Sequence, residues 1–169
     1  MRNLLLTILL IGSNLTSFGQ DNFADALVSL NSELEFIPTS ESYTTTKKPN
    51  EKLIKQFKIC AEVEKLEGLA DLNFRNITNV KSSELLTSKW KGKWQIEFQE
   101  WEFENENCAT DFINLLANLD ASKIQFCVSK GGIMWWKDKS KIYIVTSRAY
   151  FVTYHYNEIK ETIIKGLKK

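Results

Sequence analysis

Hydrophobic positions change their spacing from segment to segment after residue 20. In residues 22–36 the apolar side chains recur every three or four positions, which predicts an amphipathic helix with Asp21 as its N-cap and Pro38 just beyond its end. A second helix is predicted from Asn50, a cap residue that follows a proline, to Gly68, which suits the left-handed position after a helix. The Ser/Thr-rich segment between them is expected to be an exposed loop.

In three further segments the spacing of apolar residues is ambiguous, absent or changes partway. Residues 57–63 also alternate as a strand would, but the caps at both ends and a Glu/Lys-rich composition favour the helix. Residues 69–88 have no clean period and are expected to be irregular. Residues 90–104 predict a strand whose apolar side chains form two sets that are out of phase: Trp94, Ile96 and Phe98, then Trp101 and Phe103. This change of face predicts a β-bulge near Gln99 and Glu100.

The C-terminal half alternates strands with helices. Residues 107–120 have helical spacing, residues 123–129 alternate as a strand, and residues 131–145 contain two alternating runs around the turn "KDKS". A last helix would bury Ile159, Ile163 and Leu167. The order β-α-β-β-β-α begins like the split βαβ arrangement of ferredoxin-like folds, without its final strand. We therefore predict an α+β fold with an antiparallel or mixed sheet packed with the N-terminal helices.

Residues 1–19 have the layout of a secretory signal peptide: one basic residue, an apolar run over residues 4–11, and small residues at the end. The apolar run is too short to cross about 30 Å of hydrocarbon. No cysteine precedes Cys60, so a cysteine-linked lipid anchor has no acceptor. We predict cleavage after Gly19, a secreted or periplasmic location, and a single domain over residues 20–169.

Charge and motif content argue against several function classes. The 22 basic and 21 acidic residues nearly balance, whereas a nucleic-acid partner requires a basic excess. The chain has no nucleophile elbow, no phosphate-binding glycine loop and no zinc-protease motif. Its single histidine does not suit the usual zinc sites. We predict no cofactor, no metal, no nucleic acid and no stable membrane insertion, which leaves a non-catalytic binding or interaction domain as the leading function.

The three cysteines, Cys60, Cys108 and Cys127, allow at most one internal disulfide. We expect none, because burial alone explains Cys60. A Cys60–Cys127 bridge would require the second helix to pack on the strand that carries Cys127. Cys108 lies at a helix start, where the helix dipole favours the reactive thiolate, and His155 is the sole histidine. A Cys108–His155 dyad is therefore the enzyme alternative.

Glutamates are frequent in residues 97–106, and paired carboxylates serve in hydrolysis and in calcium binding. They alternate with Trp101 and Phe103, however, as a solvent face alternates with a buried one. The run also lacks the glycine and the ligand spacing of a calcium loop. We interpret Glu100, Glu102 and Glu104 as a solvated face, place Glu106 and Asp111 at a helix start, and assign these acids no metal or catalytic role.

The adjacent tryptophans, Trp135 and Trp136, must point to opposite faces of the predicted hairpin. A four-residue "KDKS" turn pairs Trp136 with Lys141 and Met134 with Tyr143. Trp135 then joins an aliphatic face that we assign to the core, formed by Ile133, Ile142 and Ile144.

Two interpretations of the second face are open. If the N-terminal helix covers it, the domain has three layers and Trp136 is a core residue. If it stays partly exposed, Trp136, Met134 and Tyr143, with Lys141 beside them, bind a protein partner or a small ligand such as a glycan. We take this aromatic surface patch as the predicted binding site.

Overall fold

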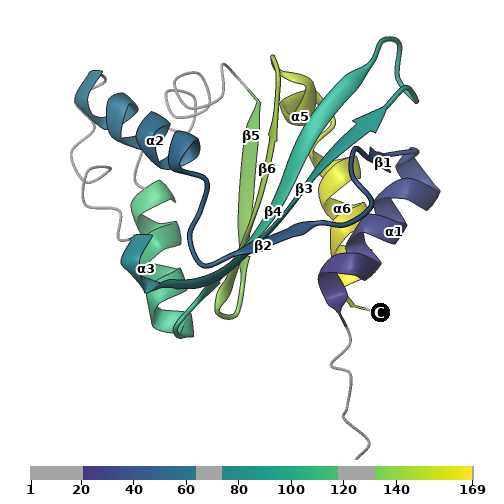
Figure 1. Ribbon diagram of the computed structural model, residues 1–169. Coiled ribbons are helices and arrows are strands. Elements are labelled where there is room, and N and C mark those ends of the chain that lie inside the picture. The colour runs from purple at the N-terminus through teal and green to yellow at the C-terminus, as the bar shows by residue number, and fades with distance from the viewer. Residues whose placement is uncertain (1–20, 64–73, 118–131, 169) are drawn as a thin grey trace, which may run out of the picture.

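The computed structural model describes residues 21–63, 74–117 and 132–168, and in these residues a six-stranded antiparallel sheet lies between two layers of helices (Figure 1). The strand order is β1-β3-β4-β6-β5, and β2 also pairs with β3. The strands are β1 (Ile37–Pro38), β2 (Thr44–Thr46), β3 (Ile77–Thr87), β4 (Trp94–Phe103), β5 (Ile133–Asp138) and β6 (Lys141–Ser147). The helices are α1 (Asn22–Leu34), α2 (Glu51–Val63), the 3-10 turn η1 (Phe74–Asn76), α3 (Glu106–Ala117), α5 (Phe151–Tyr154) and α6 (Tyr156–Leu167). The predicted α+β class is confirmed.

Each face of the sheet has its own hydrophobic cluster. The helices α2 and α3 cover one face, where Phe57 and Phe112 pack against the strands. On the other face α1, α5 and α6 contribute Leu30, Val152 and Ile163. An amphipathic helix can bury only one stripe of side chains, so each helix layer needs one side of the sheet to complete its core.

β4 supplies both clusters because its two faces are buried at different ends. Ile96 and Phe98 lie under α1 and α6, whereas Trp101 and Phe103 lie under α2 and α3. All four side chains are at most 3% exposed. The two out-of-phase sets of apolar residues are thus the two faces of one straight strand.

The bulge predicted near Gln99 and Glu100 is therefore wrong. Both residues keep regular partners on β3 and on β6. The register shift in the β3–β4 pair lies instead between Ile77 and Asn79. A strand that changes its buried face halfway along has the same sequence pattern as a bulged strand, and only its neighbours distinguish the two.

The irregular conformation expected over residues 69–88 is wrong for β3. Val80 packs in the α2/α3 cluster and Leu85 in the α1/α6 cluster, on opposite faces of the strand. Between them lie hydroxyl and charged residues, so no single alternation of apolar and polar positions runs through β3.

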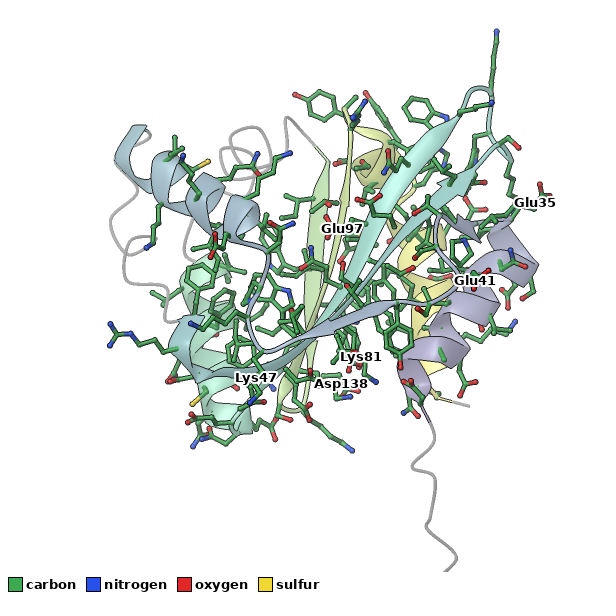
Figure 2. The ribbon with its side chains drawn as sticks, in the orientation of Figure 1. Glu35, Glu41, Lys47, Lys81, Glu97 and Asp138 are labelled. Atoms are coloured by element: carbon green, nitrogen blue, oxygen red, sulfur yellow. The ribbon has the colours of Figure 1, made fainter. Side chains whose placement is uncertain are left out.

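α1 begins at Asn22 as predicted, but the Asp21 side chain does not cap it. The carboxylate of Asp21 instead accepts hydrogen bonds from the Tyr43 hydroxyl and from Lys81 Nζ, the latter at 2.7 Å (Figure 2). Partial burial opposes ionisation of Asp21, yet the hydrogen bonds from Lys81 and Tyr43 outweigh it and hold its pKa below the ordinary value. Asp21 thereby ties the start of α1 to β3.

α2 has the predicted cap, since Asn50 Oδ1 accepts a hydrogen bond from the Lys52 backbone N–H at 2.8 Å. The helix, rather than the strand alternative, is confirmed. The predicted terminal Gly68, the predicted strand over residues 123–129 and the predicted signal peptide over residues 1–19 lie outside the described residues.

β5 and β6 form the predicted hairpin with a shorter turn. Lys139 and Ser140 make the turn, and Lys139 has the positive φ of 51° that two-residue turns favour. Trp136 pairs with Tyr143, two positions from the predicted partner. Because side chains alternate with a period of two, this shift leaves each residue on its predicted face.

Candidate functional site

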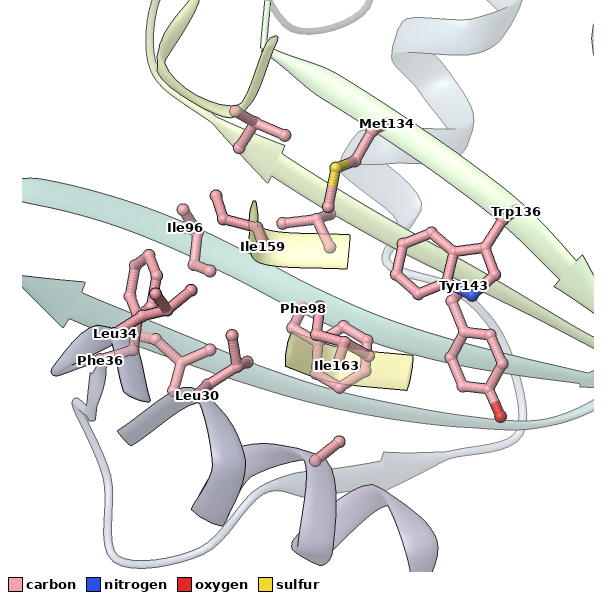
Figure 3. Packing of buried hydrophobic residues seen from close by; sticks show 14 of the residues in the cluster. Leu30, Leu34, Phe36, Ile96, Phe98, Met134, Trp136, Tyr143, Ile159 and Ile163 are labelled. Atoms are coloured by element: carbon pink, nitrogen blue, oxygen red, sulfur yellow. The ribbon is translucent and has the colours of Figure 1, made fainter. Parts of the chain in front are cut away.

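The structure buries the aromatic patch that the sequence predicted. Trp136 is 9% exposed, Tyr143 3% and Met134 2%, and all three pack in the cluster under α1 and α6 (Figure 3). The rings of Trp136 and Tyr143 stack with their centroids 5.4 Å apart, and Lys160 Nζ of α6 lies 5.9 Å from the Trp136 ring centroid. Of the two interpretations, the three-layer one holds, and these side chains are core residues.

Lys141, the fourth residue of that patch, pairs with a buried carboxylate. Its Nζ lies 3.0 Å from Glu100 Oε1, and Glu100 is 1% exposed rather than part of a solvated face. Burial, and then the charge of Glu100, raise the pKa of Tyr143 far above its ordinary value, so that this phenol stays neutral. Lys141 compensates a charge that would otherwise be buried alone.

The two residues of the enzyme alternative lie on opposite sides of the sheet. Cys108 of α3 packs against the α2/α3 cluster, and its Sγ accepts a hydrogen bond from Asn76 Nδ2 at 3.3 Å. His155 lies between α5 and α6, with its ring centroid 4.4 Å from that of Trp90 and 4.8 Å from that of Phe151. The structure does not bring Cys108 and His155 together.

Cys60 is disulfide-bonded, whereas Cys108 is a free thiol. The expectation of no disulfide is therefore wrong. Cys60 is buried on α2, and a buried cysteine gives the same apolar signal in a sequence whether or not it is bridged. Cys127, the partner weighed for it, lies outside the described residues.

A cavity of about 630 Å³ lies over β3 and β4, bordered by β2 and the N-terminal end of α2. Its floor is on the α2/α3 face of the sheet, because Ser82 and Gln99 lie two residues along from Val80 and Trp101 of that cluster. The lining is mostly hydroxyl, amide and carboxylate residues: Thr39, Ser40, Thr44, Thr46, Lys48, Pro49, Asn50, Glu51, Val80, Ser82, Ser83, Glu84, Glu97 and Gln99.

A chain of hydrogen bonds fixes the floor of this cavity. Glu97 Oε1, on β4 (Figure 2), accepts hydrogen bonds from Ser82 Oγ at 3.0 Å and from Gln99 Nε2 at 2.8 Å. Gln99 Oε1 in turn accepts one from the indole N–H of the buried Trp101 at 2.7 Å. The Glu97 carboxylate is thus held in place by a side chain of the hydrophobic core, before any ligand is present.

Two acidic residues are direct cross-strand partners on this floor. Glu84 of β3 is the direct cross-strand neighbour of Glu97, and like charges in that relation repel each other. Gln95 Nε2 donates to Glu84 at 3.1 Å, but among the described residues no salt bridge includes Glu84 or Glu97. Glu51 also lines the cavity, in the first turn of α2 where the helix dipole favours negative charge. Among the described residues of the lining, Lys48 is the one cation.

Sequence reasoning missed this cavity for two reasons. It interpreted Glu97 as part of a solvated acidic run, and it expected no strand over the segment that contains Glu84. Without β3 in place, nothing in the sequence sets the two glutamates opposite each other. The Ser/Thr-rich composition of residues 39–46 could have indicated a polar site, because β2 brings this segment to the rim of the cavity.

Comparison with protein-family models, curated proteins and solved structures finds no match. In the described part of the chain, no three His, Cys, Asp or Glu side chains gather as a metal site would require. None of the described helices combines the length and the apolar content that a membrane-spanning segment needs. The fold and the site together define the protein as an α+β domain with a polar, acidic cavity.

Proposed function

We propose that the chain is a non-catalytic binding domain whose ligand site is the polar cavity over β3 and β4. The observation that carries the proposal is the cross-strand pair Glu84 and Glu97, in which hydrogen bonds link Glu97 through Gln99 to the buried Trp101. The cavity volume falls within the range of roughly 300 to 1,000 Å³ that is usual for small-ligand sites. The ligand group that fits is a cation with several N–H donors, an alkylammonium or a guanidinium.

Charge compensation favours such a cation. Two like charges on cross-strand partners repel each other, and a cation bound between them would replace that repulsion with two attractive interactions. Ser82 and Gln99 both donate to Glu97 Oε1, and the Oε2 atom has no hydrogen bond within the described residues. A guanidinium presents its N–H groups in a planar fork that matches carboxylate oxygens of this kind.

The lining also favours a cation over a ligand that binds by stacking on aromatic rings. None of the described residues that line the cavity is aromatic, and the stacking of a sugar ring or a nucleobase needs an aromatic face. The hydroxyl groups of Thr44, Thr46 and Ser82 donate within the protein, so they offer acceptor oxygens to the N–H groups of a ligand.

The test is a titration of the protein with arginine amide, followed by backbone amide chemical shifts. Citrulline amide is the control ligand, because it has nearly the same shape without the positive charge. We expect shift changes around Ser82, Glu84 and Glu97 with arginine amide and much weaker ones with citrulline amide. Equal responses to the two ligands, or none, would contradict the proposal.

Variants test whether the Glu84 and Glu97 carboxylates bind the ligand. Glu84→Gln and Glu97→Gln should each weaken arginine-amide binding roughly tenfold, since a charge-assisted hydrogen bond contributes about 1.5 to 3 kcal/mol. Glu104→Gln, an exposed acid just beyond β4, is the matched control and should leave the affinity unchanged. Glu84→Gln should also stabilise the empty protein by a few tenths of a kcal/mol, because it removes a like-charge pair.

We also propose that the protein is exported by its first 19 residues. The disulfide at Cys60 supports this, because disulfides persist in oxidising compartments. Expression of the full sequence in a secreting bacterial host should give a periplasmic or extracellular product that begins at Gln20. A product that keeps Met1 and stays in the cytoplasm would contradict the assignment.

A further inference from the structure

A second surface of opposite charge lies at the end of the sheet where the β3–β4 hairpin and α5 meet (Figure 1). We call it the aromatic end. Its aromatic residues are Trp90, Trp94, Tyr150, Tyr154 and His155, and its cationic residues are Lys89, Lys91, Lys93 and Arg148. Tyr154 is 81% exposed and Tyr150 44%, which makes them the most exposed aromatic side chains in the described part of the chain.

The two tryptophans of the aromatic end pack against neighbouring rings of the protein. Trp94 stacks on Phe151 with an interplanar angle of 11° and centroids 4.7 Å apart, and its indole N–H donates to the Lys91 carbonyl. Trp90 packs on His155, and Lys89 Nζ lies 5.6 Å from its centroid. Bases and sugars that bind by stacking need a bare ring face, and His155 and Phe151 each cover part of one of these two rings.

The most exposed aromatic rings are instead those of Tyr150 and Tyr154, which pack edge to face with their centroids 6.4 Å apart. A tyrosine tip combines an apolar ring with a polar hydroxyl, the combination that is enriched at the boundary between lipid headgroups and acyl chains. Lys91 and Lys93 of the β3–β4 hairpin and Arg148, which precedes α5, are exposed. Lys89 and His155 share the Glu158 carboxylate, at 3.7 Å each, whereas Lys91, Lys93 and Arg148 have no salt bridge among the described residues.

We propose that the aromatic end binds the surface of a bilayer that contains anionic phospholipids, with the tyrosine tips at headgroup level and the lysines toward the phosphates. This contact is peripheral and reversible, because each cation near an anionic surface contributes only about a fivefold gain in affinity. It does not depend on the cation-binding cavity, which opens on the other face of the sheet.

The test is cosedimentation of the full chain with vesicles of equimolar phosphatidylcholine and phosphatidylglycerol, compared with vesicles of pure phosphatidylcholine. We expect binding to the anionic vesicles only, lost at high salt because exposed charges are then screened. Lys91→Gln combined with Lys93→Gln should weaken binding roughly thirtyfold, and Tyr154→Ser should weaken it several-fold.

Matched variants on α2 make the test specific. Lys52→Gln combined with Lys58→Gln removes the same charge from exposed positions of another surface and should leave binding unchanged. The melting temperature of every variant should stay at the wild-type value, which separates lost binding from lost folding. The proposal is overturned if the α2 variant loses as much binding as the hairpin variant. It is also overturned if the chain binds neither vesicle, or if a soluble acidic polysaccharide retains the protein while the anionic vesicles do not.

Discussion

Gly166 of α6 lies so close to α1 that a Cβ atom at this position would come within 2.5 Å of the Ala26 Cα atom. An alanine inside a helix ordinarily gains roughly 0.5 to 1 kcal/mol over glycine. Here the added methyl group meets backbone atoms of Asp25 and Ala26, which cannot move unless the two helices separate. We expect Gly166→Ala to destabilise the fold by about 1 to 3 kcal/mol, the usual effect of overpacking, in urea unfolding at neutral pH.

The control for this variant is Glu161→Ala, at an exposed position of the same helix. It should change the free energy of unfolding by no more than about 0.5 kcal/mol. A Gly166→Ala protein as stable as the wild type would mean that α1 and α6 are not in the close contact described.

Loss of an aromatic ring should lower the stability of the fold much more at Trp136 than at Tyr154. Trp136→Ala should cost about 3 to 5 kcal/mol, since Trp136 is 9% exposed and packs beneath α6. Tyr154→Ala, at 81% exposure, should cost less than about 0.5 kcal/mol. Thermal unfolding followed by circular dichroism measures both, and a small loss for Trp136→Ala would restore the exposed-patch interpretation.

Alkaline titration should reveal the contact between Tyr43 and Asp21. The hydrogen bond to Asp21, followed by burial, raises the pKa of Tyr43 from 10.0 to about 12. A raised pKa means that the contact stabilises the fold below pH about 10 and that this contribution is lost as the pH rises through about 12. In ultraviolet difference spectra, Asp21→Asn should move one tyrosine to a lower midpoint. Identical titration curves for the two proteins would show that the contact does not form.

Counting thiols decides the cysteine chemistry. Alkylation of the unfolded chain without reductant should modify one cysteine, Cys108, because Cys60 is bridged. After reduction all three cysteines of the chain should be modified. Intact mass spectrometry reads both states, and three modified thiols before reduction would rule out the bridge in the isolated protein.

Elements with strong local signals could be predicted from the sequence. The spacing of Phe23, Ala26, Leu30 and Leu34 sets the buried stripe of α1, and the Asn50 cap starts α2. The faces of the β5–β6 hairpin were also correct although its register was not, because a slip of two residues conserves the face.

What could not be predicted depends on contacts between distant segments. Whether Trp136 is buried is decided by α1 and α6, far from it in the sequence. Glu100 was expected in solvent because its neighbours alternate, yet Lys141 of β6 lets it stay buried. Glu84 and Glu97 became a candidate site only once β3 was known to pair with β4.

β4 places Phe98 in one hydrophobic cluster and Trp101 in the other, three residues apart on a single strand. Neither helix layer has another sheet to pack on in the described structure, so melting of this strand removes the support of both. The two cores therefore behave as one cooperative unit. Damage to one layer lowers the stability of the other, and both the acidic cavity and the aromatic end persist only as long as this central strand does.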